Sequence, residues 1–141
     1  MSNRVTASAP GKINIFFKVG ALQENGYHDV LSVYQALDIR ESVSVVPNHE
    51  WQVTVSGELS AEQIAAVPTG EENLVVRAAK VIADLAGLGE PQPVKFEITK
   101  NVPVAGGMGG GSADAAAALL AVDELWCTGV DGQSLIQSAA D

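Results

Sequence analysis

The sequence predicts an α+β domain in which a mostly antiparallel sheet is covered by helices. Two observations predict it. Apolar and polar residues alternate through most of the first half, which is the pattern of half-buried strands. Beyond residue 73, segments with apolar residues at helical spacing flank one further strand pattern. With 141 residues, 47% of them hydrophobic, the chain can build one domain around a single core.

The strand patterns begin at Arg4 and continue to Val19. Residues 9–11, with the sequence Ala-Pro-Gly, interrupt this pattern, which predicts two strands around a tight loop. The residues Glu-Asn-Gly at 24–26 are typical of a turn. After this turn, short strand runs are predicted through residues 30–39 and 43–55, broken by Pro47-Asn48 and by Gly57.

Helices are predicted in the second half. Asn73 offers an N-cap, and the apolar residues that follow it predict a helix of about fifteen residues that stops at Gly87. A strand at residues 94–99 comes next. A second helix is expected from Ser112 to Cys127 and a third from near Asp131. The third pattern is still running at residue 141, so we expect one domain, residues 1–141, truncated near its end.

Charge and cysteine content narrow the class of protein. The formal net charge of −9 and the pI of about 4.5 argue against binding nucleic acid or an anionic membrane through bulk electrostatics. The single cysteine, Cys127, cannot form an internal disulfide, and no signal-peptide core or transmembrane-length apolar run follows Met1. We therefore expect a cytoplasmic protein. The sequence does not predict an oligomeric state.

A glycine-rich loop at residues 103–113 lies between a predicted strand and a predicted helix. Glycine fills five of the six positions from Gly106 to Gly111. Without Cβ atoms the backbone can approach a ligand closely, and the free N–H groups at the next helix start attract anions. The loop can wrap phosphates without a basic side chain of its own, because no lysine or arginine follows Lys100. The alternative is a flexible surface loop or a tight packing site.

Spacing excludes two common phosphate-binding motifs. Gly106 and Gly111 have the separation of a Walker loop, but Ser112-Ala113 stands where Lys-Ser or Lys-Thr is required. A dinucleotide fingerprint that starts at Gly107 fails because Ser112 occupies the place of its third glycine.

The loop resembles that of the GHMP kinases, which are named for galactokinase, homoserine kinase, mevalonate kinase and phosphomevalonate kinase. Met108 replaces a leucine of the family pattern, and Gly110 and Gly111 replace two serines. Residues 9–15 (APGKINI) and 72–79 (ENLVVRAA) also resemble family motifs. The resemblance covers nearly the whole chain and is weakest between residues 44 and 70. It implies the amino-terminal GHMP domain, of ribosomal protein S5 domain 2-like topology, with the carboxy-terminal domain absent.

One branch of the family fits best. The Gly-Tyr-His at residues 26–28 is similar to the signature of the branch that phosphorylates a cytidine diphosphate sugar alcohol. The resemblance implies that Lys12 is catalytic, beside the substrate hydroxyl and the γ-phosphate. It implies substrate contacts by Asn14 to the polyol and by Tyr27 and His28 to the cytosine. The implied ATP-binding residues are Asn73, Leu74, Pro103, Val104, Ala105, Gly106, Gly107, Met108, Gly109, Gly110, Gly111, Ser112 and Ala113.

ATP is the implied co-substrate, and Mg²⁺ is implied by ATP chemistry. No residue is predicted as a metal ligand, although the Ser112 hydroxyl could bind a phosphate oxygen or approach the ion. Asp114 would repel an anion, so we expect it to point away or to engage the helix terminus. By analogy, the catalytic aspartate should follow about four residues beyond Asp141, which is not itself that base. We therefore expect the 141 residues alone to bind nucleotide weakly without turnover.

Two other functions stay open. One is a different GHMP kinase with a smaller alcohol or a phosphorylated substrate, which the Tyr27-His28 pair argues against. The other is a non-catalytic nucleotide-binding module. The second histidine, His49, lies in a polar turn, and we expect it on the surface.

Overall fold

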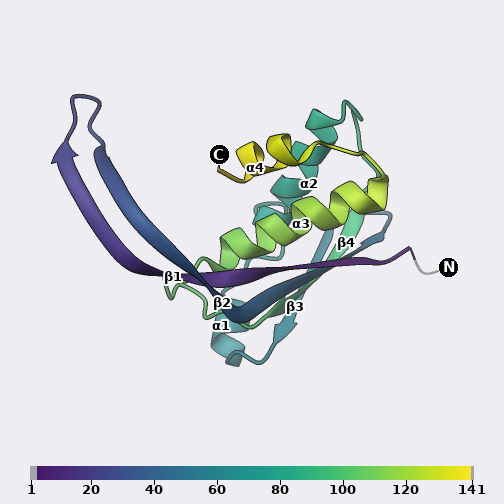
Figure 1. Cartoon of the computed structure of the whole chain (residues 1–141). Coiled ribbons are helices and arrows are strands. Elements are labelled where there is room, and N and C mark those ends of the chain that lie inside the picture. Colours follow the sequence, from purple (N-terminus) through teal and green to yellow (C-terminus); the bar gives the residue numbers. More distant parts are fainter. Residues whose placement is uncertain (1–2, 141) are drawn as a thin grey trace.

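The computed structural model describes residues 3–140, and Asp141 lies outside them. One four-stranded sheet is combined with helices (Figure 1). The strands are β1 (Val5–Leu22), β2 (His28–Pro47), β3 (Gln52–Gly57) and β4 (Val94–Lys100). The helices are α1 (Ala61–Ala65), α2 (Leu74–Leu85), α3 (Gly110–Trp126) and α4 (Gly132–Ala140).

The strand order in the sheet is β1-β2-β4-β3. The β1–β2 and β2–β4 pairs are antiparallel, and β3–β4 is parallel. The parallel pair requires a crossover, and the segment that contains α1 and α2 provides it. The predicted α+β class with a mostly antiparallel sheet is therefore confirmed.

The first strand differs from its prediction. Residues 9–11 are not a loop between two strands but lie inside the continuous strand β1, where the register with β2 shifts between Pro10 and Lys12. The extra residues at this shift, 37–39, lie on β2, and β1 is an edge strand, where a proline without an N–H can be tolerated. The strand β2 is likewise continuous over 20 residues and ends at Pro47, and β3 ends at Gly57, which are the two breaks that the sequence predicted.

Residues 12–39 form a projecting two-stranded arm (Figure 1). Here β1 and β2 pair with each other, whereas β4 pairs only with residues 42–47 of β2. The tip turns at Gly26, whose φ is 81°. Large apolar side chains are exposed along the arm: Ile13, Ile15, Phe16, Phe17, Val19, Leu22, Tyr27, Val30, Leu31, Val33, Tyr34 and Ile39. The arm therefore lies outside the core.

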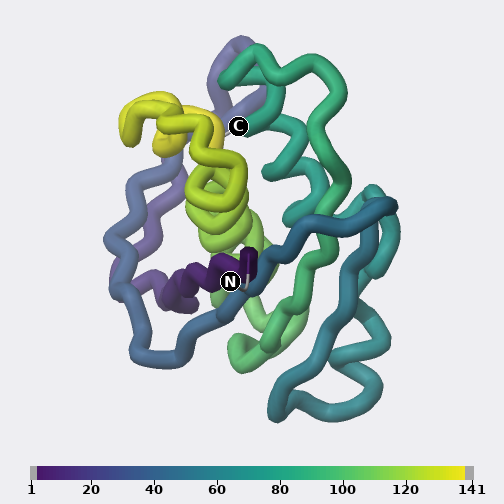
Figure 2. Tube along the Cα trace, turned by 90° about the vertical axis from the view of Figure 1, so that its right-hand side faces the viewer, coloured from purple at the N-terminus to yellow at the C-terminus, as the bar shows by residue number. Residues whose placement is uncertain are grey.

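The core lies between the other end of the sheet and the helices. Val43 and Val45 of β2 pair with Ile98 and Phe96 of β4, and all four side chains are buried. The helix α3 packs on β1 and β2, and α2 packs beside α3. Figure 2 shows α3 at the centre of the molecule, with α2 on one side of it and the β1–β2 strands on the other. Small buried residues of α3, such as Ala117, allow this close packing.

The helix ends agree largely with the sequence. The Asn73 side chain accepts a hydrogen bond from the Val75 N–H, which confirms the predicted N-cap. The helix α2 ends before Gly87, whose φ of 66° lies in the left-handed region. Its 12 residues are fewer than expected. The short α1, which was not predicted, begins after Ser60. No helix within residues 3–140 is long and apolar enough to cross a membrane.

Candidate functional site

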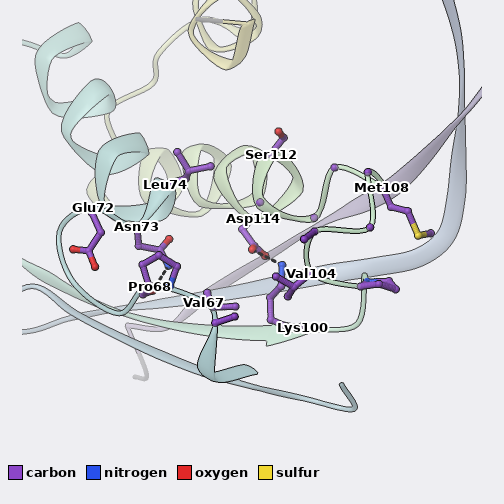
Figure 3. A pocket seen from close by; sticks show the side chains of 18 residues that line it. Val67, Pro68, Glu72, Asn73, Leu74, Lys100, Val104, Met108, Ser112 and Asp114 are labelled. Atoms are coloured by element: carbon purple, nitrogen blue, oxygen red, sulfur yellow. Dashed lines mark hydrogen bonds and ion pairs between the residues drawn. The ribbon is translucent and has the colours of Figure 1, made fainter. Parts of the chain in front are cut away.

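A pocket of about 440 Å³ lies between the glycine loop and the start of α2 (Figure 3). Every residue predicted to bind ATP lines it except Ala113. The N–H of Ala113 instead donates to the Gly109 carbonyl oxygen, 2.8 Å away, in the first turn of α3, and its side chain is buried. Six further residues, which were not among the predicted ATP-binding residues, complete the lining: Ala66, Val67, Pro68, Glu72, Lys100 and Asp114.

The loop meets α3 at a left-handed residue. Gly109 is the N-cap of α3 with φ of 74°, and no side chain caps this helix end. The first N–H groups of any helix have no acceptor within the helix, and they coincide with the positive end of the helix dipole. Because Gly110, Gly111 and Ser112 carry such groups and also line the pocket, this wall of the pocket suits an anion.

Lys12 lies at the edge of the loop. Its backbone N–H donates to the Met108 carbonyl oxygen across 2.9 Å, and its Nζ donates to the Gly107 carbonyl oxygen across 2.7 Å. Nζ also donates to Oδ1 of Asn14, 2.8 Å away, and lies 5.3 Å from the centre of the Tyr34 ring. The loop contains no basic residue, yet the part of β1 just after the register shift at residues 10–12 brings an ammonium group to it.

Asn14 is held on the same side of β1 as Lys12. Its Nδ2 donates to the Ser32 hydroxyl across 2.6 Å, and that hydroxyl donates to the Phe16 carbonyl oxygen across 3.2 Å. This chain of hydrogen bonds orients the amide so that its oxygen faces Lys12. The two side chains are therefore placed together at the base of the arm.

The opposite wall of the pocket comes from the start of α2 (Figure 3). Asn73 is 6% exposed, and its amide is used within the fold: Oδ1 accepts from the Val75 N–H, and Nδ2 donates to the Pro68 carbonyl oxygen across 2.6 Å. Leu74 presents an apolar side chain to the pocket. This wall is suited to the flat apolar face of a ring.

A buried ion cluster lies beneath the loop. Lys100 Nζ is 2.6 Å from Oε1 of Glu41 and 2.7 Å from Oδ2 of Asp114. The expectation that Asp114 points away or engages the helix terminus is therefore wrong. Its carboxyl group is buried and directed at Lys100 (Figure 3), and burial raises its pKa to about 6 despite the neighbouring lysine.

The sequence contains a signal for this cluster. Val94, Phe96 and Ile98 are the inward residues of β4, and Lys100 is the next residue in the same alternation. On α3, Asp114 shares a face with the buried Ala117 and Ala118. Two opposite charges in core positions on either side of one loop indicate a buried pair.

Tyr27 and His28 lie at the tip of the arm and not at the pocket. His28 pairs with Leu22, which is ten residues along β1 from Lys12, or roughly 30 Å at the usual rise of a strand. The Tyr27 side chain is 75% exposed. The His28 Nδ1 lies 2.9 Å from the Gly20 carbonyl oxygen, so Nδ1 carries the proton and Nε2 is left as an acceptor.

Comparison with known proteins identifies the family. Residues 73–141 match the family described as GHMP kinases N terminal domain. The chain is 47% identical over 136 residues to the 4-diphosphocytidyl-2-C-methyl-D-erythritol kinase of Leifsonia xyli subsp. xyli, a match that covers 96% of this chain and 43% of that protein. The chain belongs to the GHMP kinase family. The structure thus shows an amino-terminal GHMP domain.

Two further proteins support this placement. The 4-diphosphocytidyl-2-C-methyl-D-erythritol kinase of Clavibacter michiganensis subsp. michiganensis is 50% identical over 127 residues, which are 90% of this chain and 39% of that protein. A crystal structure of 4-(cytidine 5'-diphospho)-2C-methyl-D-erythritol kinase superposes with a TM-score of 0.68 at 29% identity, over 95% of this chain and 45% of that one. This GHMP chain therefore spans less than half the length of these relatives.

The GHMP kinases transfer phosphoryl groups to small molecules, and such chemistry commonly uses Mg²⁺. Within the part of the chain that the structure describes, no cluster of three His, Cys, Asp or Glu residues could hold a metal ion. The Asp114 carboxyl group is directed at Lys100, and Ser112 lies on the opposite face of α3 (Figure 3). These residues do not form a metal cage.

Proposed function

We propose that the protein to which this segment belongs transfers the γ-phosphoryl group of ATP to the 2-hydroxyl of 4-diphosphocytidyl-2-C-methyl-D-erythritol. This would be a step of the non-mevalonate route to isoprenoids. The identity to two kinases of this name, over at least 90% of the chain, supports the proposal. Because the chain spans 43% and 39% of those proteins, the activity is proposed for a protein of their length.

The observation that carries the proposal is the position of Lys12. Its ammonium group lies at the edge of a glycine loop whose helix start offers free N–H groups. In the proposed reaction the loop amides hold the triphosphate, and Lys12 favours the ionised form of the attacking hydroxyl and offsets the charge that develops in phosphoryl transfer. ATP would place its adenine against Leu74, and Mg²⁺ would accompany the phosphates.

Asn14 would bind the polyol of the alcohol substrate. Its amide oxygen accepts from Lys12, and its amide nitrogen is fixed by Ser32, so both groups are held in one orientation beside the ammonium group. A rigid amide next to the proposed nucleophile restricts the orientation of the substrate hydroxyls.

Tyr27 and His28 would bind the cytosine. An exposed tyrosine ring can stack on a pyrimidine, and the free Nε2 of His28 can accept from the exocyclic amine of cytosine. For these residues to share one ligand with Lys12, the arm must curve toward the pocket. The strand β1 contains three register shifts, the last two of them between Asn14 and Leu22, and such irregularities are the places where strands bend.

The decisive experiment is a phosphotransfer assay on the full-length protein. We expect ATP-dependent phosphorylation of 4-diphosphocytidyl-2-C-methyl-D-erythritol with kcat/KM at least about 100-fold above that for mevalonate or homoserine, because a site built for the cytidyl group loses those contacts with smaller alcohols. A higher kcat/KM for one of the smaller alcohols would show a different GHMP kinase. Binding of ATP without any transfer would show a nucleotide-binding module.

A pair of histidine variants tests the cytosine assignment. His28→Ala should raise the KM for the cytidyl substrate about tenfold or more and leave the KM for ATP unchanged. His49→Ala is the matched control, because this exposed histidine lies between β2 and β3, away from the pocket lining. If both variants keep the wild-type KM for the cytidyl substrate, His28 does not bind the base.

A further inference from the structure

Three charged side chains from three elements meet under the glycine loop: Glu41 of β2, Lys100 at the end of β4, and Asp114 of α3. They are 0%, 2% and 4% exposed. The desolvation of a buried ion costs several kcal/mol, and replacing a buried ion pair by packed apolar residues is often neutral or stabilising. Stability alone is therefore a poor reason for this cluster, and its position next to the pocket suggests another one.

The cluster joins the two ends of the loop. Lys100 is the last residue of β4, and Asp114 lies in the second turn of α3, so their 2.7 Å contact closes the segment 101–113. Five of the residues in this segment are glycines between positions 106 and 111, and glycine loses more conformational freedom on ordering than any other residue. A contact that fixes both ends reduces the freedom of such a loop.

The third member anchors the closed loop to the sheet. Oε1 of Glu41 contacts the Lys100 ammonium group, and Oε2 accepts from the Asn101 backbone N–H across 2.9 Å. Asn101 is the first residue of the segment, and its Nδ2 donates to the Arg40 carbonyl oxygen, also across 2.9 Å. The start of the loop is thereby tied to β2 by a side chain and by the backbone.

The loop rests directly on these charges at the start of α3. A Cβ atom on Gly110 would lie 3.0 Å from Oε1 of Glu41 and 3.2 Å from Nζ of Lys100. Gly110 carries one of the N–H groups at the helix start and also lines the pocket. Any movement of the cluster would therefore move the backbone that faces the proposed triphosphate.

We propose that Lys100 and Asp114 are positioning residues for the nucleotide, which act as a buried clasp that holds the glycine loop in its binding geometry. This inference rests on the proposed function. With all three groups ionised the cluster has a formal charge of −1, so it cannot attract phosphate by its net charge. Its contribution is the placement of the loop, with Glu41 as the anchor.

The test uses the full-length protein and measures the KM for ATP and for the alcohol substrate separately. Asp114→Ala should raise the KM for ATP about tenfold or more and leave the KM for the alcohol within about twofold. Asp114→Asn keeps an oxygen that can accept from Lys100, so the KM for ATP should stay within about threefold of the wild-type value.

The matched control is Asp123→Ala, on the same helix. Asp123 accepts from the Val130 N–H and the Thr128 hydroxyl at the far end of α3, so this variant should lose thermal stability and keep the KM for ATP. If Asp114→Ala only lowers the melting temperature and the active fraction, as Asp123→Ala does, the clasp is merely structural and the proposal is wrong. A tenfold rise in the KM for ATP of Asp114→Asn would also overturn the proposal, because the charge of residue 114 would then matter more than its position.

The outcomes separate this inference from the proposed function. If the wild-type protein phosphorylates a different alcohol, the proposed substrate is wrong, and the KM for ATP still tests the clasp. If the wild-type protein transfers no phosphate, the dissociation constant of the ATP analogue AMPPNP replaces KM. Should Asp114→Ala fail to fold, Asp114→Asn and Asp114→Glu decide the matter. The longer carboxylate should displace the loop and raise the KM for ATP about tenfold or more, and wild-type KM values in Asp114→Glu would contradict the clasp.

Discussion

The backbone N–H of Lys12 donates to the Met108 carbonyl oxygen across 2.9 Å, so the strand β1 and the glycine loop are joined through main-chain atoms. This contact does not involve the Lys12 side chain. The position of residue 12 beside the loop should therefore survive substitution, and variants at this residue report on chemistry more than on folding.

The first prediction follows from that contact. Lys12→Met should lower kcat at least about 100-fold, which is the usual cost of removing one group that stabilises transition-state charge. The melting temperature should change by no more than a few degrees. Lys18→Met, an exposed lysine further along the same strand, is the control and should keep wild-type kcat. Comparable kcat values for Lys12→Met and Lys18→Met would mean that Lys12 takes no part in the reaction.

A second prediction compares two neighbouring glycines. Gly110→Ala places a methyl group 3.0 Å from a buried carboxylate oxygen and should destabilise the fold by roughly 1–3 kcal/mol. In Gly111→Ala the nearest atom is Cδ1 of Leu74, at an ordinary 3.5 Å, and alanine favours the helix, so stability should stay the same or rise by about 0.5 kcal/mol. Urea unfolding measures both values. If Gly110→Ala is no less stable than Gly111→Ala, the charged side chains beneath Gly110 move aside easily for the added methyl group.

The third prediction concerns pH. Burial raises the pKa of Asp114 from 3.8 to about 6 in the folded state. A raised pKa stabilises the fold fully below pH 3.8, and this contribution is lost as the pH rises through about 6. The free energy of unfolding should therefore fall by roughly 2 kcal/mol from this group between pH 4 and 7. Asp114→Asn should lack this component. If the unfolding free energy of Asp114→Asn depends on pH as that of the wild type does, another group is responsible for this dependence.

The fourth prediction separates the core from the arm. Phe96 is fully buried in β4, and Phe96→Ala should cost about 3–5 kcal/mol of unfolding free energy. Phe17 is 58% exposed on the arm, and Phe17→Ala should cost no more than about 0.5 kcal/mol. Denaturant unfolding of both variants provides the test. A large cost at Phe17 would mean that the arm is packed in solution.

The parts of the fold that depend on neighbouring residues could be predicted from the sequence. Asn73 caps α2 through a bond to a residue two positions away, and Gly87 ends that helix through its own backbone angle. The continuity of β1 through residues 9–11 depends on pairing with residues about thirty positions away, so local turn propensity gave the wrong result. The helix α1 was missed, although Ser60 and Gln63 are spaced as in a capping box.

The candidate site also divides into features that neighbouring residues predict and features that depend on residues far apart in the sequence. The glycine loop could be recognised because its residues are contiguous, and the structure places all of them except Ala113 at one pocket. The cluster beneath the loop joins residues 41, 100 and 114, and only the phases of Lys100 in its strand and of Asp114 in its helix pointed to it. The separation between Lys12 and the arm tip depends on the curvature of two paired strands, which no residue pattern specifies.

The strand order also constrains how this molecule assembles. Within the described residues β3 pairs only with β4, and 36 residues lie between the end of β3 at Gly57 and the start of β4 at Val94. A chain that emerges from the ribosome can form the β1–β2 hairpin early, since those strands are adjacent in sequence. Until residue 100 is available, β3 has no edge to join, and α3, which packs on β2, lies still further along the chain. Synthesis of β4 is thus the step that allows β3 to join the β1–β2 hairpin in one sheet.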